Sequence, residues 1–143
     1  MARSYRIGEL ARQVDVPVAT IRYYEREQLL PKPNRSAGNF RLYSEAHRDR
    51  LVFIRQCRSL DMTLEEISSL LKLKEDPQSS CEQVNSLIDD HIADVTRRVA
   101  QMQRLKQDLE SLRRRCDSTR SAGECAILAG LLAARPERPH PGD

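Results

Sequence analysis

Near the N-terminus, hydrophobic residues recur every three or four positions along the chain. The first four such positions are Ile7, Leu10, Ala11 and Val14. This spacing predicts a helix of about two turns. Asp15-Val16-Pro17 interrupts the pattern, and Pro17 suits the first turn of a second helix, where its missing N–H is not needed.

The second predicted helix has apolar residues on one side and polar or aromatic residues on the other. Val18 and Ile21 face inward. The residues that face partly outward are Ala19, Thr20, Arg22, Tyr23 and Tyr24. Two short helices around a tight turn are typical of a helix-turn-helix that binds DNA, although an ordinary helical hairpin has the same pattern.

The next segment, "PKPNRSAGNFRLYSEAH", favours DNA binding over the simple hairpin of helices. Phe40 and Leu42 alternate with Arg41 and Tyr43, which predicts a β-hairpin with Gly38-Asn39 near its tip. A basic hairpin directly after a helix-turn-helix acts as a wing. We expect this wing to lay Arg35 and Arg41 against phosphates; the alternative is a solvated hairpin.

Residues 44–72 predict two further helices. Leu51, Ile54 and Cys57 lie on one face of the first, so Cys57 is interpreted as a core residue and not as a metal ligand. The sequence from Thr63 to Glu66 forms a capping box, which predicts where the second helix begins.

Residues 81–115 contain no Gly or Pro and predict one long helix. Ser80 and Gln83 form a second capping box at its start. Its apolar positions step by three or four residues and form a narrow seam: Ile88, Ile92, Val95, Val99, Met102, Leu105, Leu109 and Leu112. A helix of roughly 50 Å is too long for the preceding small domain to cover. We therefore expect a second copy of the chain to pair with it.

Composition and charge favour a nucleic-acid reader that carries a separate module. Residues 1–60 hold 12 Lys and Arg against 6 Asp and Glu, whereas residues 61–143 hold 12 against 15. No apolar run approaches the roughly 20 residues of a membrane span, and "MARSYRIGEL" lacks a secretory h-region, so a cytoplasmic location is expected. The sequence holds no nucleophile–base pairing or phosphate-cradling glycine loop, so an enzyme is disfavoured.

Three cysteines are placed at the ends of the predicted long helix. Cys81 opens it and Cys116 closes it, and eight residues separate Cys116 from Cys125. In an antiparallel dimer, Cys81 of one protomer meets Cys116 and Cys125 of its partner. Thiolates are soft ligands, and the helix N-terminus lowers the pKa of Cys81, so a site for a soft cation is predicted.

Other interpretations of these cysteines remain open. Free thiols or a reversible disulfide would make the protein a thiol redox regulator that uses no metal. An iron–sulfur cluster is disfavoured because it usually needs four closely grouped cysteines. His91 and Asp94 could hold an accessory ion, but a solvated or interface pair is favoured. Residues 134–143, which include His140, are proline-rich and predicted to be disordered.

Several stretches together resemble the MerR family of transcriptional regulators. "IGELARQVDVPVATIRYYEREQLLP" and "NRSAGNFRLY" are similar to its winged helix-turn-helix. "SLDMTLEEISSLL", "CEQVNSLIDDHI" and "RRRCDSTRSAGECAIL" resemble its cadmium- and lead-responsive branch, the CadR- and PbrR-like proteins. The resemblance covers about residues 5–133.

This resemblance implies specific DNA contacts and metal ligands. The recognition helix would contribute Thr20, Arg22, Tyr23 and Tyr24 to DNA binding, and the wing would contribute Arg35, Asn39, Arg41 and Tyr43. Metal would bind Cys81, Cys116 and Cys125. Copper-sensing relatives have Ser at the position of Cys81, so a third thiolate implies a divalent effector: Cd²⁺ or Pb²⁺, with Zn²⁺ or Hg²⁺ as alternatives.

The resemblance also implies how transcription is activated. A homodimer would bind a pseudo-palindromic promoter on double-stranded DNA whose spacer is too long for RNA polymerase. Metal binding would then bend and untwist that spacer.

The expected fold is mainly α. Residues 1–75 form a winged helix-turn-helix DNA-binding domain, residues 80–115 form an antiparallel dimerisation helix, and residues 116–133 form a metal-binding loop and short helix. Residues 134–143 are the tail.

Overall fold

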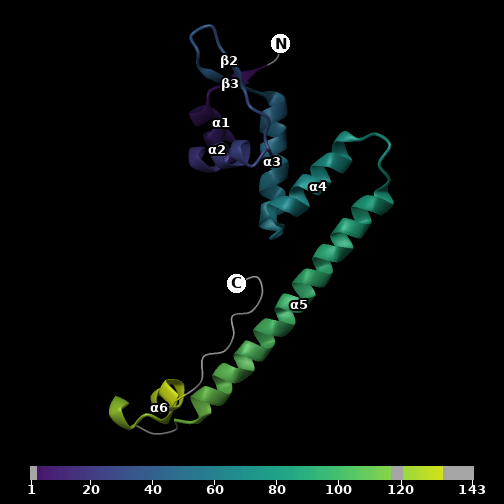
Figure 1. Cartoon of the computed structure of the whole chain (residues 1–143). Helices are drawn as coiled ribbons and strands as arrows, with labels where there is room; N and C mark the ends of the chain where they lie inside the picture. The colour runs from purple at the N-terminus through teal and green to yellow at the C-terminus, as the bar shows by residue number, and fades with distance from the viewer. Residues whose placement is uncertain (1–2, 117–120, 134–143) are drawn as a thin grey trace. The chain divides into compact units, whose positions relative to one another are not determined.

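The computed structural model of the chain describes residues 3–116 and 121–133. The chain divides into two compact units, Met1–His91 and Ile92–Asp143. The first unit contains three short strands and four helices together with the start of a fifth helix (Figure 1). The predicted tail, residues 134–143 with His140, lies outside the described residues.

Helices α1 (Ile7–Val14) and α2 (Val18–Arg26) form the predicted helix-turn-helix. Asp15 ends α1 in the left-handed conformation, with φ of 55°, and its N–H donates to the carbonyl of Ala11. Pro17 is the N-cap of α2 and not a residue of its first turn. Its carbonyl accepts the N–H groups of Thr20 and Ile21, which explains why the helix begins just after the proline.

The wing contains the predicted hairpin and one strand that was not predicted. Strands β2 (Asn34–Arg35) and β3 (Arg41–Ser44) are antiparallel, with Arg35 opposite Arg41. The additional strand β1 (Ser4–Tyr5) pairs with the other edge of β3, giving the order β1-β3-β2. A two-residue strand shows no alternation that a sequence could reveal, but it anchors the wing because the Tyr5 side chain is buried.

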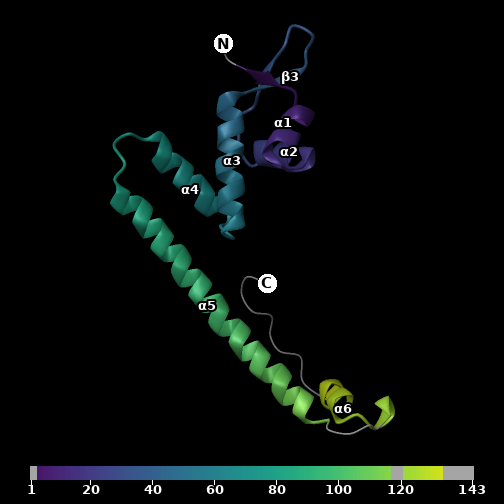
Figure 2. The same cartoon turned by 180° about the vertical axis from the view of Figure 1, so that it is seen from behind.

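Helices α3 (Glu45–Ser59) and α4 (Leu64–Glu75) complete the first unit. Helix α1 packs against both α2 and α3, and the strands lie on one side of α1, next to the end where α3 begins (Figures 1 and 2). Leu51, Ile54 and Cys57 are buried in one core with Leu10 and Ile21, as their spacing predicted. Because α2 and the wing both contribute side chains to this core, the core holds them in a fixed position relative to each other.

Both capping boxes predicted from the sequence are present. At the start of α4, the N–H of Glu66 donates to Thr63 Oγ1 at 3.1 Å, and the N–H of Thr63 donates to Glu66 Oε1 at 2.9 Å. Ser80 and Gln83 make the same reciprocal pair before α5, with distances of 3.0 and 3.3 Å. Each pair satisfies backbone N–H groups that a helix start leaves without partners.

Helix α5 (Cys81–Arg114) is long, as predicted, and its seam is open. Leu87 and Ile88 pack against the core of the first unit. The apolar seam is defined here by its exposed members in the second unit: Ile92, Val95, Val99, Met102, Leu105 and Leu109. After α5 come a short turn of helix, η1 (Ala122–Glu124), and the apolar helix α6 (Ala126–Ala133), on which Leu132 is 90% exposed. Of the helices described, none is both long and apolar enough to cross a membrane.

The capping box at Thr63 provides a test of what fixes the α3–α4 corner. We expect Thr63→Ala to lower the free energy of unfolding by about 1 kcal/mol, because the N–H of Glu66 loses its acceptor. Urea unfolding at fixed protein concentration measures this loss. Thr96→Ala, in the interior of α5, is the matched control and should be neutral or slightly stabilising, since alanine has the higher helix propensity. Equal effects of the two substitutions would contradict the role of the cap.

Candidate nucleic-acid interface and metal centre

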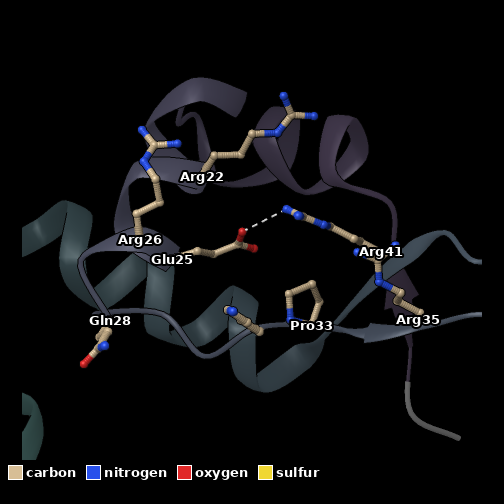
Figure 3. Close-up of a pocket in the computed structure, with 8 residues that line it drawn as sticks. Arg22, Glu25, Arg26, Gln28, Pro33, Arg35 and Arg41 are labelled. Atoms are coloured by element: carbon tan, nitrogen blue, oxygen red, sulfur yellow. Dashed lines mark hydrogen bonds and ion pairs between the residues drawn. The ribbon is translucent and has the colours of Figure 1, made fainter.

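A basic pocket lies between α2 and the wing, and its volume is about 860 Å³ (Figure 3). Five cationic side chains line it: Arg22, Arg26, Lys32, Arg35 and Arg41. The remaining lining residues are Glu25, Gln28 and Pro33. A hollow with this surplus of positive charge suits an anionic ligand such as the phosphates of a nucleic acid.

Glu25 joins the two sides of this basic pocket. Its side chain is buried, and Oε1 accepts a hydrogen bond from the Tyr43 hydroxyl at 2.5 Å. Its Oε2 accepts from Arg41 Nη1 at 3.2 Å, the contact drawn as a dashed line in Figure 3. Burial, followed by the hydrogen bond to Glu25, raises the pKa of Tyr43 to about 12. Tyr43 therefore stays protonated and donates to the carboxylate at neutral pH.

The residues expected to contact DNA differ in exposure. Arg22, Tyr23, Arg35, Asn39 and Arg41 are exposed, and Thr20 is half-buried. Tyr24 and Tyr43 lie instead in the core, with 7% and 0% of their surface exposed. Tyr43 has no exposed surface and cannot contact DNA in this conformation, and Tyr24 offers DNA little surface. These two tyrosines therefore support the surface from beneath, because the packing of α2 and β3 turns them inward.

The wing tip is held by its own polar groups. Arg35 Nη1 lies 3.3 Å from Oδ1 and 3.4 Å from the carbonyl of Asn39, to which it donates. Asn39 has a φ of 65°, the left-handed conformation that asparagine tolerates in turns. The predicted pair Arg35 and Asn39 thus lies together on one exposed hairpin.

Two cations of the basic pocket, Arg26 and Lys32, were not predicted from the sequence. Arg26 follows Arg22 by four residues, which places both on one face of α2. This four-residue spacing could have identified Arg26 from the sequence as a neighbour of Arg22. Lys32 lies in an irregular segment between α2 and β2, where spacing gives no orientation.

The structure brings Cys116 and Cys125 together in the second unit. Cys125 immediately precedes α6, and the backbone N–H groups of Leu128 and Ile127 point at its sulfur. The N–H of Leu128 is the largest cause of a lowered pKa for the Cys125 thiol, and a hydrogen bond from Cys116 lowers it further. Both cysteines are half-exposed, and the lowered pKa of Cys125 favours the thiolate form that soft metal ions bind.

The remaining cysteines have different surroundings. Cys81 is exposed and is the first residue of α5, so it stands at the opposite end of that helix from Cys116. Cys57 is a buried core residue, as predicted, and burial raises the pKa of its thiol. The chemistry of the four thiols therefore separates Cys57 from the other three.

His91 and Asp94 were interpreted as a solvated or interface pair, and the structure contradicts the solvated interpretation for His91. Its side chain is buried, with Nε2 at 2.8 Å from the carbonyl of Leu60 and Nδ1 at 2.9 Å from Glu66 Oε2. The first turns of α5 pack on the α3–α4 corner, which a pattern within α5 alone cannot reveal. Asp94 pairs with Arg97 on its own helix, and its carboxylate also lies in one group with His91 and Glu66, whose potential ligand atoms are all within 4.8 Å of one another.

Comparisons with known proteins settle the family. Residues 5–74 match the MerR HTH family regulatory proteins, and residues 48–112 match the MerR DNA-binding region. A relative from Haemophilus influenzae, the HTH-type transcriptional regulator ZntR homolog, is 44% identical over 76% of this chain and 80% of its own length. The chain belongs to the MerR family. It is therefore a DNA-binding transcriptional regulator and not an enzyme.

Solved structures of MerR regulators agree with this fold. PbrR691 from Ralstonia metallidurans, in complex with lead(II), is 51% identical, with a TM-score of 0.80 over 89% of this chain and 98% of that one. MerR from Bacillus megaterium, in complex with mercury(II), is 32% identical, with a TM-score of 0.70 over 90% of this chain and 99% of that one. The mainly helical winged helix-turn-helix with a long helix, expected from the sequence, is confirmed.

The environment of Cys125 predicts an order of thiol reactivity. In the metal-free, reduced protein, we expect iodoacetamide to alkylate Cys125 with a pH midpoint below the ordinary thiol value, because the N–H of Leu128 stabilises its thiolate. Cys57 should react only slowly at the same pH, since it is buried. Short alkylation pulses followed by mass spectrometry of tryptic peptides measure both, because each cysteine falls in a different peptide. A Cys125 midpoint at or above the ordinary thiol value would contradict the assignment.

Proposed function

We propose that this MerR regulator responds to a soft divalent heavy-metal ion held by Cys81, Cys116 and Cys125. The single observation that carries the proposal is the contact between Cys116 and Cys125 beside the first N–H groups of α6. Two thiols in contact, with the pKa of Cys125 lowered, suit a cation that binds thiolate, such as Cd²⁺ or Pb²⁺, with Zn²⁺ and Hg²⁺ as alternatives. The lead(II) and mercury(II) complexes of the two related structures support this class of effector.

The third ligand comes from a second protomer. Cys81 and Cys116 stand at opposite ends of α5, so one chain cannot bring them together along a straight helix. The exposed apolar seam supports pairing of two α5 helices, because six large apolar side chains in a row seek a covering surface. In antiparallel pairing, the start of one α5 lies beside the end of the other. The homodimer then carries two sites, each with thiols from both chains.

The basic pocket and the wing bind promoter DNA. Arg22 and Arg26 on α2 face the same hollow as Arg35 and Arg41 on the wing. This supports a recognition helix in the major groove with the wing on the phosphate backbone. In a two-fold dimer the arrangement is repeated, which fits a pseudo-palindromic operator.

Metal binding alters transcription through the helices that connect these parts. Cys81 of one protomer and Cys116 and Cys125 of the other would hold the ion, which would supply a positive charge that draws these thiolates together. Within one chain, α5 begins at Cys81, and its first turns pack against the core that holds α2 and the wing. A change at the start of α5 therefore reaches the DNA-binding surface, and the dimer activates the promoter by distorting its spacer so that RNA polymerase can use both elements.

Removing one thiol tests the metal proposal. We expect Cys81→Ser, Cys116→Ser and Cys125→Ser each to abolish metal-induced transcription from the target promoter while DNA binding without metal stays within about twofold, because the thiols lie outside the basic pocket. Cys57→Ala is the matched control and should keep induction. All assays contain a reductant, so that a disulfide-based response gives no signal. Normal induction in all three serine variants would rule out the thiol site.

Removing one wing cation tests the DNA-binding assignment. We expect Arg35→Ala to weaken binding to all DNA sequences by a similar factor and to lower the slope of log affinity against log salt by about 0.9 for one lost phosphate contact. Lys106→Ala removes the same charge from an exposed position on α5 and is the matched control. Affinity is measured by fluorescence anisotropy across a KCl series. A loss confined to one base sequence would make Arg35 a base-reading residue instead.

A further inference from the structure

A carboxylate in the basic pocket requires an explanation. Glu25 is the one acidic residue among the eight that line it. A negative charge at this position repels phosphates and weakens the attraction that the five cations provide. Glu25 is also buried, and a buried carboxylate lowers stability unless partners compensate its charge.

The partners of Glu25 are two residues of a single strand. Arg41 and Tyr43 are two positions apart on β3, so their side chains leave the strand on the same face. Both donate to the Glu25 carboxylate, Tyr43 to Oε1 and Arg41 to Oε2. Hydrogen bonds to an ionised group are shorter and stronger than neutral ones. The Glu25 carboxylate on α2, the recognition helix, is thus hydrogen-bonded to two side chains of the wing.

This connection determines where the Arg41 guanidinium lies. The Arg41 side chain is 45% exposed, whereas that of Glu25 is 8% exposed. One side of the guanidinium therefore contacts the protein and the other faces the basic pocket (Figure 3). Tyr43 has no exposed surface and keeps its proton at neutral pH, so its bond to Glu25 persists under conditions of DNA binding.

We propose that Glu25 is a positioning residue for DNA binding: it fixes the wing against the recognition helix and orients Arg41 toward a phosphate. The proposal rests on the DNA-binding function assigned above. Its consequence is that the spacing between the cations of α2 and those of the wing is set before DNA arrives. A pre-set spacing favours one groove geometry over others and raises affinity for the correct site.

The direction in which one substitution changes DNA affinity distinguishes this positioning role from a simple electrostatic one. Glu25→Gln removes a negative charge while keeping the size of the side chain. If the carboxylate only repelled DNA, its removal would tighten binding to every duplex. If it positions Arg41, binding to the correct site weakens although the protein has become more positive. Tyr43→Phe tests the same connection with no change of charge.

The experiment uses the full chain and a duplex that the wild-type protein selects from a random-sequence pool, with a scrambled duplex for comparison. We expect Glu25→Gln to weaken binding to the selected duplex by about tenfold. The slope of log affinity against log salt should fall by about 0.9, which corresponds to one lost phosphate contact. Binding to the scrambled duplex should be unchanged or tighter. Tyr43→Phe should weaken binding to the selected duplex by a smaller factor.

Glu27→Gln is the matched control, because Glu27 is an exposed glutamate at the end of the same helix and does not line the basic pocket. It should leave binding unchanged or slightly tighter. Thermal melting shows whether each variant is folded, and if Glu25→Gln does not fold, Tyr43→Phe decides. The proposal is overturned if Glu25→Gln behaves like Glu27→Gln, or if a folded Tyr43→Phe keeps wild-type affinity and salt slope. Failure of the wild-type chain to select any duplex would refute DNA binding itself.

Discussion

The exposed apolar seam of α5 is the constraint on which the arrangement of the molecule depends. Six large apolar side chains follow one another along the part of the helix in the second unit, and each is at least 38% exposed. Covering such a side chain contributes about 1.5–3 kcal/mol, so leaving the whole seam in water is costly. In the homodimer proposed above, a second α5 provides the matching surface, and antiparallel pairing would bring the start of one α5 beside the end of the other. The proposed dimer thereby accounts for the positions of Cys81 and Cys116 at the two ends of α5.

The features that the sequence predicted are those that depend on neighbours a few residues away. The capping boxes at Thr63 and Ser80 are four-residue patterns, and both are present. The inward face of α3 follows from helical spacing, so Cys57 was placed correctly in the core. The length of α5 follows from the absence of Gly and Pro. Local rules of this kind carry over directly from sequence to structure.

The features that the sequence did not predict depend on contacts between distant segments. Glu25 and Tyr43 are 18 residues apart and meet only because the core brings α2 against β3. The resemblance to MerR regulators placed Tyr43 on the DNA-binding surface, because the alternation of residues 40–43 alone does not show which face of the strand is buried. His91 meets Leu60 from 31 residues away. Charge and aromatic character indicate that a residue belongs to a binding site, but packing decides whether that residue contacts the ligand or supports another residue.

Cys57 has a further consequence for how the protein handles sulfur chemistry. It is the sole cysteine of the first 80 residues, and its burial and raised thiol pKa make it inert. Oxidants and thiol-seeking ions that reach the protein thus meet accessible sulfur at Cys81, Cys116 and Cys125, and none in the first 80 residues. Oxidation or alkylation of the accessible thiols therefore leaves the core of the winged helix-turn-helix unmodified.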